Sequence, residues 1–283
     1  MHKGWVATGV VLALTGGTAG FALAQSGGGA SDYSSSGGNE TGVRPTAVGL
    51  PEIGESGTVG ASEYVNSLKA YHDSGQYDKD LAAVGAAAKA YLDQRIAQNG
   101  KSTLTCRVSY KRTHKRQNHH LVYRRFKHCT TTQRPNQKLA VVFDIDETSL
   151  SNYSFLAAAG FSSAGLVPAA VAGTSPAIQP TLALYREAVS KGVAVFFITG
   201  RPSQVATISE NNLKSAGYNQ GWNGISFKPS GVGTEAFKSG ARAKIEQQGY
   251  DIAIDIGDQE SDLDGGHADH DFKLPNPYYF ISD

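Results

Sequence analysis

The stretch Lys138-Leu-Ala-Val-Val-Phe-Asp-Ile-Asp-Glu-Thr148 decides the fold class. Residues 138–143 form an apolar run with the length and branched side chains of a buried strand. Asp144 and Asp146 follow directly, and both face one side because side chains alternate along extended backbone. Two adjacent carboxylates repel each other unless a cation joins them or one is protonated. The stretch therefore predicts a strand that delivers two acidic groups to a ligand site.

Three more strand-like segments follow, and segments of helical spacing separate them. The predicted strands are 193–198, 225–227 and 252–256, and the predicted helices are 181–191, 203–216 and 234–248. Strands that alternate with helices favour a parallel sheet covered on both faces, with ligands bound beyond the carboxyl ends of the strands. We therefore expect an α/β fold with the acidic pair at its binding edge.

Polar residues stand at the other strand ends as well. Thr199-Gly200 follows the second strand and offers a hydroxyl and a tight turn for an anion, while Lys238 opens the third helix. Gly257, Asp258 and Asp262 follow the last strand. A lone turn or a lone helical lysine is usually structural, but four such features in order at four strand ends are harder to obtain by accident. Carboxylates, a hydroxyl and a lysine predict a site for Mg²⁺ and phosphate together.

The first 60 residues differ in composition from the rest. Residues 1–24 have a short basic start and an uncharged run that ends in Ala22-Leu23-Ala24, a typical signal-peptidase site. We expect residues 1–24 to be a signal peptide, so that the protein is secreted or lies at the extracellular surface and keeps no stable membrane span after processing. A retained anchor is the alternative. Residues 25–60 are rich in Gly and Ser and predict a flexible linker.

Residues 61–132 predict two helices and a hairpin. Helical spacing extends over residues 62–98 with a break at 73–75, and β-rich runs at 104–110 and 121–129 flank a polar turn. A register that sets Cys106 opposite Cys129 lets the two runs pair as antiparallel strands. Two cysteines in an exported chain are usually bridged, so we expect a Cys106–Cys129 disulfide.

The charge of the chain is balanced overall but concentrated locally. Lys and Arg number 26 against 25 Asp and Glu, which excludes a nucleic-acid-binding polycation and an acidic disordered chain. Between the two cysteines lie eight Lys and Arg and no acidic residue. This basic hairpin either attracts an anionic substrate, a cell-surface polymer or nucleic acid, or carries charges that only keep a β edge from aggregating.

The four features at the strand ends resemble the four motifs of the haloacid dehalogenase superfamily of phosphohydrolases. The matching residues are Asp144-x-Asp146-x-Thr148, Thr199, Lys238 and Gly257-Asp258-x-x-x-Asp262. Residues 143–152, 198–202 and 272–277 look more narrowly like the branch that holds bacterial class B and C acid phosphatases and plant vegetative storage proteins. The resemblance extends from about Ser62 to the C-terminus but not over the basic hairpin, which looks like an insertion.

The resemblance implies the architecture of the domain. Residues 133–283 would form a Rossmann-like parallel sheet with helices on both faces and a small lid at about 149–180, next to N-terminal helices and an inserted β-hairpin. In this lid, Tyr153 and Phe155 either stack on a nucleobase or aryl group or form the core of the lid.

The resemblance also implies a Mg²⁺-dependent acid phosphatase, which the expected signal peptide would make a secreted one. Asp144 would attack the phosphorus of a small phosphomonoester, such as a nucleotide or sugar phosphate, and form an aspartyl-phosphate. Asp146 would protonate the leaving alcohol and then activate water. Thr199 and Lys238 would bind the phosphoryl oxygens, with Lys228 as the rival for the lysine role.

The implied metal site uses oxygen ligands only. Mg²⁺ would be held by Asp144, the backbone carbonyl of Asp146 and Asp258, while Asp262 orients these ligands. The alternative to an enzyme is a catalytically weak storage or surface-polymer-binding protein on the same fold. The retained acidic residues, Thr199 and Lys238 argue against that alternative.

Overall fold

The computed structural model describes residues 61–117, 120–133 and 135–281. The signal peptide expected at 1–24 and the linker expected at 25–60 lie outside the described residues and stay predictions. Within the described ranges, none of the helices combines the length and the apolar character needed to cross a membrane.

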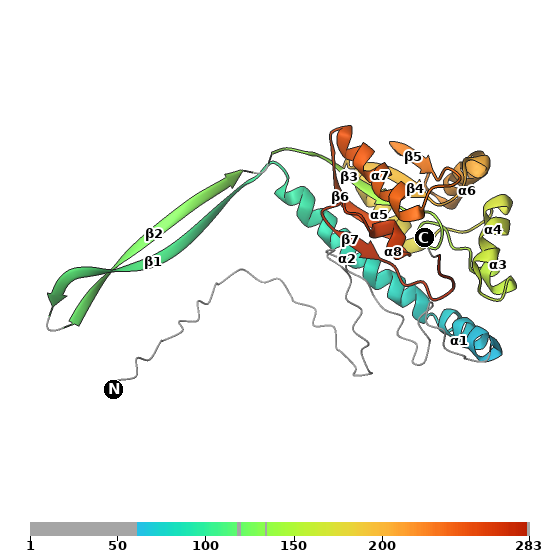
Figure 1. Cartoon of the computed structure of the whole chain (residues 1–283), viewed down its shortest axis with the longest axis horizontal. Coiled ribbons are helices and arrows are strands. Elements are labelled where there is room, and N and C mark those ends of the chain that lie inside the picture. Colours follow the sequence, from blue (N-terminus) through green and yellow to red (C-terminus); the bar gives the residue numbers. More distant parts are fainter. Residues whose placement is uncertain (1–60, 118–119, 134, 282–283) are drawn as a thin grey trace. The chain divides into compact units, whose positions relative to one another are not determined.

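A parallel sheet of five strands forms the core of the α/β fold (Figure 1). Its strands are β3 (Lys138–Phe143), β4 (Ala194–Thr199), β5 (Gly224–Phe227), β6 (Tyr250–Gly257) and β7 (Asp271–Lys273). Their order is β5-β4-β3-β6-β7, and all neighbours are parallel. The predicted α/β fold is confirmed. Because β3 is central, its carboxyl end lies between those of β4 and β6.

Helices cover both faces of this sheet, as the alternation of side chains requires. Val141 and Phe143 point to the face that packs on α2 (Gln76–Gln98) and α5 (Gln179–Ser190). Ala140 and Val142 point to the other face, which packs on α7 (Thr234–Gln247). Successive residues of β3 point to opposite faces of the sheet, and helices cover both faces. Residues 139–143 are therefore all apolar.

The N-terminal helices form part of the same core. α1 (Ala61–Asp73) and α2 are separated by a turn in which Gly75 takes a left-handed conformation with φ 74°. Gly85 lets α2 approach α5 closely, since a Cβ at this position would lie 2.6 Å from the Cβ of Pro180. The predicted pair of helices and the break between them are confirmed.

Short helices between β3 and α5 form the segment expected to be a lid. They are α3 (Tyr153–Ala158), a 3₁₀ turn at Ser163–Gly165 and α4 (Leu166–Ala172). The ring of Tyr153 stacks on His72 with 3.4 Å between centroids, and Phe161 and Tyr278 pack beside it. Tyr153 therefore belongs to an aromatic cluster between α1 and the lid, which agrees with the interpretation as lid core.

The remaining short elements lie around β4 and β6. A 3₁₀ turn at Ser203–Val205 leads into α6 (Ala206–Ala216), and α8 (Glu260–Leu263) follows β6. Both begin just past the carboxyl end of a strand, so both border the edge at which a ligand site was expected.

The hairpin is formed by β1 (Ser102–Gln117) and β2 (His120–Gln133). Its register sets Cys106 opposite Cys129, and a disulfide joins the two, as predicted. Both strands are longer than the predicted runs. β1 continues past residue 110 to Gln117, so the turn is shorter than expected, and Ser102 and Thr103 pair with Gln133 and Thr132 at the other end.

We expect the disulfide to stabilise the hairpin alone. In the chain-entropy description, a bridge across a separation of 23 residues contributes about 3 kcal/mol by restricting the unfolded loop. Reduction should speed amide hydrogen exchange in residues 102–133 and leave exchange in β3 and β6 unchanged. Equal protection of the hairpin with and without reductant, or faster exchange in the sheet, would contradict this expectation.

Candidate active site

Asp144 lies just beyond the carboxyl end of β3, and its backbone is held on two sides. Its N–H donates to the carbonyl of Ile256 on β6 at 3.0 Å, and the hydroxyl of Ser149 donates to the Asp144 carbonyl at 2.6 Å. Asp144 is buried. The loop after β3 therefore fixes the position of this carboxylate before any ligand binds.

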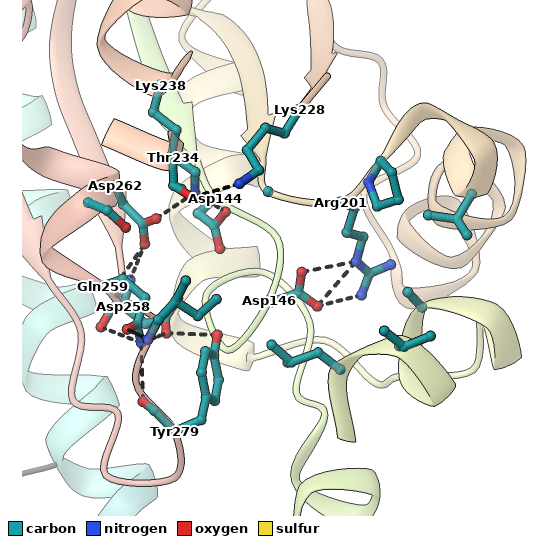
Figure 2. A pocket seen from close by; sticks show the side chains of 18 of the residues that line it. Asp144, Asp146, Arg201, Lys228, Thr234, Lys238, Asp258, Gln259, Asp262 and Tyr279 are labelled. Carbon is teal, nitrogen blue, oxygen red and sulfur yellow. Dashed lines mark hydrogen bonds and ion pairs between the residues drawn. The ribbon is translucent and has the colours of Figure 1, made fainter. Parts of the chain in front are cut away.

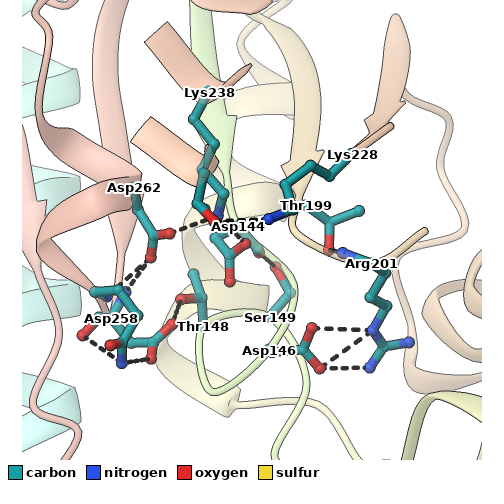
Figure 3. A network of polar contacts seen from close by, with 12 residues as sticks. Asp144, Asp146, Thr148, Ser149, Thr199, Arg201, Lys228, Lys238, Asp258 and Asp262 are labelled. Atoms are coloured by element: carbon teal, nitrogen blue, oxygen red, sulfur yellow. Dashed lines mark hydrogen bonds and ion pairs between the residues drawn. The ribbon is translucent and has the colours of Figure 1, made fainter. Parts of the chain in front are cut away.

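Lys238 joins two of the acidic residues (Figure 3). Its Nζ lies 2.5 Å from Oδ1 of Asp144 and 2.5 Å from Oδ1 of Asp262, and all three side chains are buried. Burial raises the pKa of Asp144, and the Lys238 charge opposes this shift. Burial alone would lower the pKa of Lys238, but its two carboxylate neighbours raise it above the ordinary value. The lysine thus stays protonated and supplies positive charge.

Among the described residues, the side chains that donate hydrogen bonds to Asp258 are all neutral. Gln259 Nε2, Asn276 Nδ2 and Tyr279 Oη donate to its Oδ2 at 2.7, 2.6 and 3.0 Å, and Thr148 Oγ1 donates to its Oδ1 at 3.0 Å. Burial and the nearby Asp262 carboxylate raise the pKa of Asp258 to about 6. The charge of Lys273 opposes this rise, but within the described residues no ion pair to Asp258 is formed, and a buried carboxylate of this kind is suited to a metal ion.

Asp262 holds the turn that carries Asp258. Its Oδ2 accepts the backbone N–H groups of Asp258 and Gln259, each at 2.9 Å. Gly257 permits this turn, because a Cβ there would overlap the Asp262 side chain. Asp262 therefore orients both Asp258 and Lys238.

The acidic residues fit a hard divalent cation. Carboxylate oxygens of Asp144, Asp258 and Asp262 lie within 4.8 Å of one another, and all three residues are buried. Mg²⁺ prefers oxygen ligands of this kind. The side chain of Asp146 is not part of this group, and the expected contribution of its backbone carbonyl stays a prediction.

The Asp146 carboxylate is held by Arg201, a residue to which sequence reasoning gave no role (Figure 2). Arg201 Nε lies 3.1 Å from both Asp146 oxygens and Nη2 lies 2.8 Å from Oδ1. Asn152 Nδ2 adds a bond of 2.7 Å, and Arg201 in turn donates to Ser209 Oγ at 3.0 Å. The position of Arg201 two residues after Thr199, at a strand end, was the available signal.

Of the other two residues considered for phosphate binding, Lys228 lines the cavity and Thr199 does not. Thr199 is buried, does not itself line the cavity, and accepts the Arg201 N–H at 3.1 Å on Oγ1. Lys228 lines the cavity, and its Nζ donates to Thr234 Oγ1 at 2.9 Å. Lys238, rather than its rival Lys228, contacts Asp144.

Glu147 connects this loop to the N-terminal helices. Tyr77 Oη on α2 donates to Glu147 Oε2 at 2.9 Å, and the Asn152 N–H donates to Oε1. Glu147 is buried and takes a left-handed conformation with φ 48°. Burial raises its pKa to about 8, against the opposing effect of these two hydrogen bonds. The residues before the hairpin thus help to set the loop that carries Asp144 and Asp146.

The aspartates described above, together with Arg201, Lys228 and Lys238, line one cavity of about 210 Å³. Asp144, Lys238, Asp258 and Asp262 form one end of it, and Asp146 and Arg201 lie apart from them (Figure 2). This arrangement places the Asp144 carboxylate, the Lys238 ammonium group and the Asp146 carboxylate around a single space.

Comparisons with known proteins find several plant relatives of this chain. The chain is 40% identical over 151 residues to a stem 28 kDa glycoprotein of Glycine max, covering 50% of this chain and 59% of that protein. It is 34% identical over 149 residues to acid phosphatase 1 of Solanum lycopersicum, covering 50% and 58% of the two chains. It is 30% identical over 148 residues to vegetative storage protein 1 of Arabidopsis thaliana, covering 50% and 54%. The chain thus spans little more than half the length of these relatives.

Solved structures show the same fold. The class C acid phosphatase from Bacillus anthracis aligns with a TM-score of 0.55 at 18% identity, covering 78% of this chain and 86% of that one. A family model described as HAD superfamily, subfamily IIIB (acid phosphatase), matches residues 52–282. The chain therefore belongs to subfamily IIIB of the haloacid dehalogenase superfamily, the acid phosphatase family.

Proposed function

We propose that the protein is an acid phosphatase that hydrolyses small phosphomonoesters through an aspartyl-phosphate on Asp144. The observation that carries the proposal is the placement of Asp144 in the cavity, bonded to Lys238, with Asp146 held separately by Arg201. Membership of an acid phosphatase family and the acid phosphatase of Solanum lycopersicum among its relatives support the same activity.

The first step transfers the phosphoryl group to the protein. An Asp144 oxygen forms a bond to phosphorus as the ester P–O bond breaks, and the departing alkoxide takes a proton from Asp146. Lys238 stabilises the charge on the phosphoryl oxygens, and we assign Thr199 to the same role. A free alcohol leaves.

The second step releases phosphate. Asp146, now a carboxylate, takes a proton from water, whose oxygen attacks the phosphorus of the aspartyl-phosphate. The bond between Asp144 and phosphorus breaks, and the Asp144 carboxylate is restored. One nucleophile and one acid–base group therefore complete the cycle.

We assign the metal site to Mg²⁺, with Asp144, the backbone carbonyl of Asp146 and Asp258 as ligands. Asp262 holds the Asp258 turn and so orients the ligands. When bound, the ion supplies positive charge that offsets the charges of these carboxylates and of the substrate phosphate.

The proposed activity is tested by phosphate release. The purified full chain should release phosphate from alkyl, sugar and nucleoside monophosphates in a panel assay that contains Mg²⁺, with rates that differ among the esters. A folded protein without turnover on the whole panel would favour the alternative of a storage protein, such as the vegetative storage proteins among its relatives.

Arg201 should act by positioning Asp146. We expect Arg201→Lys to lower kcat about 10- to 100-fold with KM within about twofold, because a lysine cannot hold both carboxylate oxygens as the guanidinium does. The pH–rate profile should shift as well, since the charge next to Asp146 moves. Arg186→Lys, at an exposed position on α5, is the matched control. Wild-type kcat and pH profile in Arg201→Lys would refute the positioning role.

We also propose that the protein is exported. The leader pattern of residues 1–24 and the Cys106–Cys129 disulfide support this, because disulfides persist in oxidising compartments. The exposed Arg107, Arg125 and Lys127 of the hairpin suit an anionic surface polymer. Salt-dependent binding of such a polymer by the full chain, lost when these three residues are replaced by Ser, would support the polymer contact.

A further inference from the structure

One wall of the cavity is apolar and open to solvent. Val167 and Val171 on α4 are 70% and 56% exposed, and both line the cavity. Leu166 and Ala170 from the same helix line it too. Single exposed apolar side chains are common on protein surfaces. A group of them beside a cavity, however, marks a surface that a ligand covers.

The sequence of α4 contains no polar side chain. The helix reads Leu-Val-Pro-Ala-Ala-Val-Ala over Leu166–Ala172. Val205 and Ile281 line the same cavity, and the neighbouring Phe280 is half exposed. The apolar wall, defined here as Leu166, Val167, Ala170, Val171 and Val205, offers no side-chain donor or acceptor to a ligand, while Ile281 lies beside Gln259 at the other end of the cavity.

The polar residues of the cavity mostly bond to each other. Arg201 holds Asp146, Lys228 holds Thr234, and Tyr279 Oη donates to Asp258. The buried Ser261 hydroxyl has no partner among the described residues, but it belongs to α8 together with Asp262, at the phosphoryl end. Hydrogen-bonding capacity is therefore concentrated where the phosphoryl group would bind.

The apolar wall lies on the leaving-group side of the reaction. In Figure 2, Asp146 and Arg201 are drawn on the side where the yellow-green helix α4 runs, away from Lys238 and Asp262. Asp146 is the residue assigned to protonate the leaving oxygen. The alcohol must therefore sit near Asp146, and the atoms attached to it meet the apolar wall.

We propose that the enzyme prefers phosphomonoesters of apolar alcohols, such as short branched alkyl or aryl groups, over sugar and nucleoside phosphates. The proposal rests on the phosphatase function proposed above. An apolar alcohol removes the exposed valines from water, whereas a sugar would place hydroxyls against a wall that cannot bond to them. The cavity volume of about 210 Å³ lies below the roughly 300–1,000 Å³ typical of pockets that enclose drug-sized ligands, which also favours a compact alcohol.

The preference is measured with esters of two primary alcohols. Isopentyl phosphate and glycerol phosphate present similar leaving groups to Asp146 but differ in polarity beyond it, and adenosine monophosphate serves as a large polar ester. We expect kcat/KM for isopentyl phosphate to exceed that for either polar ester about tenfold or more. A higher kcat/KM for glycerol phosphate or adenosine monophosphate would overturn the proposal.

The esters also differ in intrinsic reactivity, so variants of the protein are compared on the same two esters. The double variant Val167→Thr and Val171→Thr keeps the size of the side chains and adds two hydroxyls to the wall. It should lower kcat/KM for isopentyl phosphate about tenfold and leave that for glycerol phosphate within about twofold. Val108→Thr, at an exposed hairpin position, should change neither.

The outcomes separate this inference from the proposed function. Equal effects of the double variant on both esters would refute the role of the apolar wall while leaving the phosphatase intact. Absence of turnover on all three esters, by a folded wild-type protein, would instead refute the phosphatase function on which the inference rests.

Discussion

Asp144→Asn is expected to lower kcat for phosphate release by about 10⁴-fold or more while the protein stays folded. The amide keeps the size of the side chain but is a much poorer nucleophile than a carboxylate. The substitution also removes a proposed metal ligand and one of the two carboxylates that Lys238 contacts. Nucleophile and ligand are lost together, so the effect should exceed that of any other single replacement.

The control for this prediction is a buried aspartate elsewhere. Asp80 on α2 is buried and bonds to Tyr71 at 2.5 Å, and it does not line the cavity. Asp80→Asn should retain wild-type kcat, whatever its effect on stability. Turnover near the wild-type rate in a folded Asp144→Asn protein, checked by circular dichroism and thermal unfolding, would exclude Asp144 as the nucleophile.

Removal of divalent ions should abolish activity, and Mg²⁺ should restore it. Without a cation, Asp144, Asp258 and Asp262 leave a buried acidic group whose oxygens lie within 4.8 Å, and the substrate adds a further negative charge. Lys238 alone cannot balance these charges. We expect phosphate release to fall at least about 100-fold after exhaustive chelation.

Thermal unfolding gives a second measurement that does not depend on turnover. Mg²⁺ should raise Tm because it binds the folded site, and Asp258→Asn should remove most of this increase. Asp271→Asn, at a buried position outside the cavity, is the matched control and should keep the increase. Full activity after chelation, together with a Tm that does not change when Mg²⁺ is added, would contradict the assigned metal site.

The core of the fold could be predicted because β3 is buried on both faces. Residues 139–143 are apolar for that reason, and the predicted strand matches β3 (Lys138–Phe143). β7 escaped prediction because it has only three residues, Asp271–Lys273, and so shows no periodicity. It is a strand because it pairs with β6, which is tertiary information.

Part of the acidic site could be predicted because its residues lie next to the ends of predicted strands and helices. Asp144, Asp258 and Lys238 follow strands or open a helix, so topology alone brings them to one edge. Tyr279 and Asn276 reach Asp258 from the C-terminal segment, and Tyr77 reaches Glu147 across 70 residues. Such contacts follow from the folded path of the chain and have no local signature.

The two aromatic residues of the lid show where sequence reasoning stops. Tyr153 and Phe155 suited either a ligand or the lid core, since aromatic rings serve both purposes. In the structure Tyr153 stacks on His72, and neither residue lines the cavity. The valines of α4 line it instead, and an apolar helix in a sequence is ordinarily assigned to the core.

The most direct test of the account is to trap the covalent intermediate. Enzyme mixed with substrate in the presence of Mg²⁺ is quenched and treated with borohydride, which reduces an aspartyl-phosphate to homoserine, and the residue is located by peptide mass spectrometry. The account predicts homoserine at position 144 in the wild-type protein and none in Asp144→Asn. Modification at another residue, or none during active turnover, would contradict it.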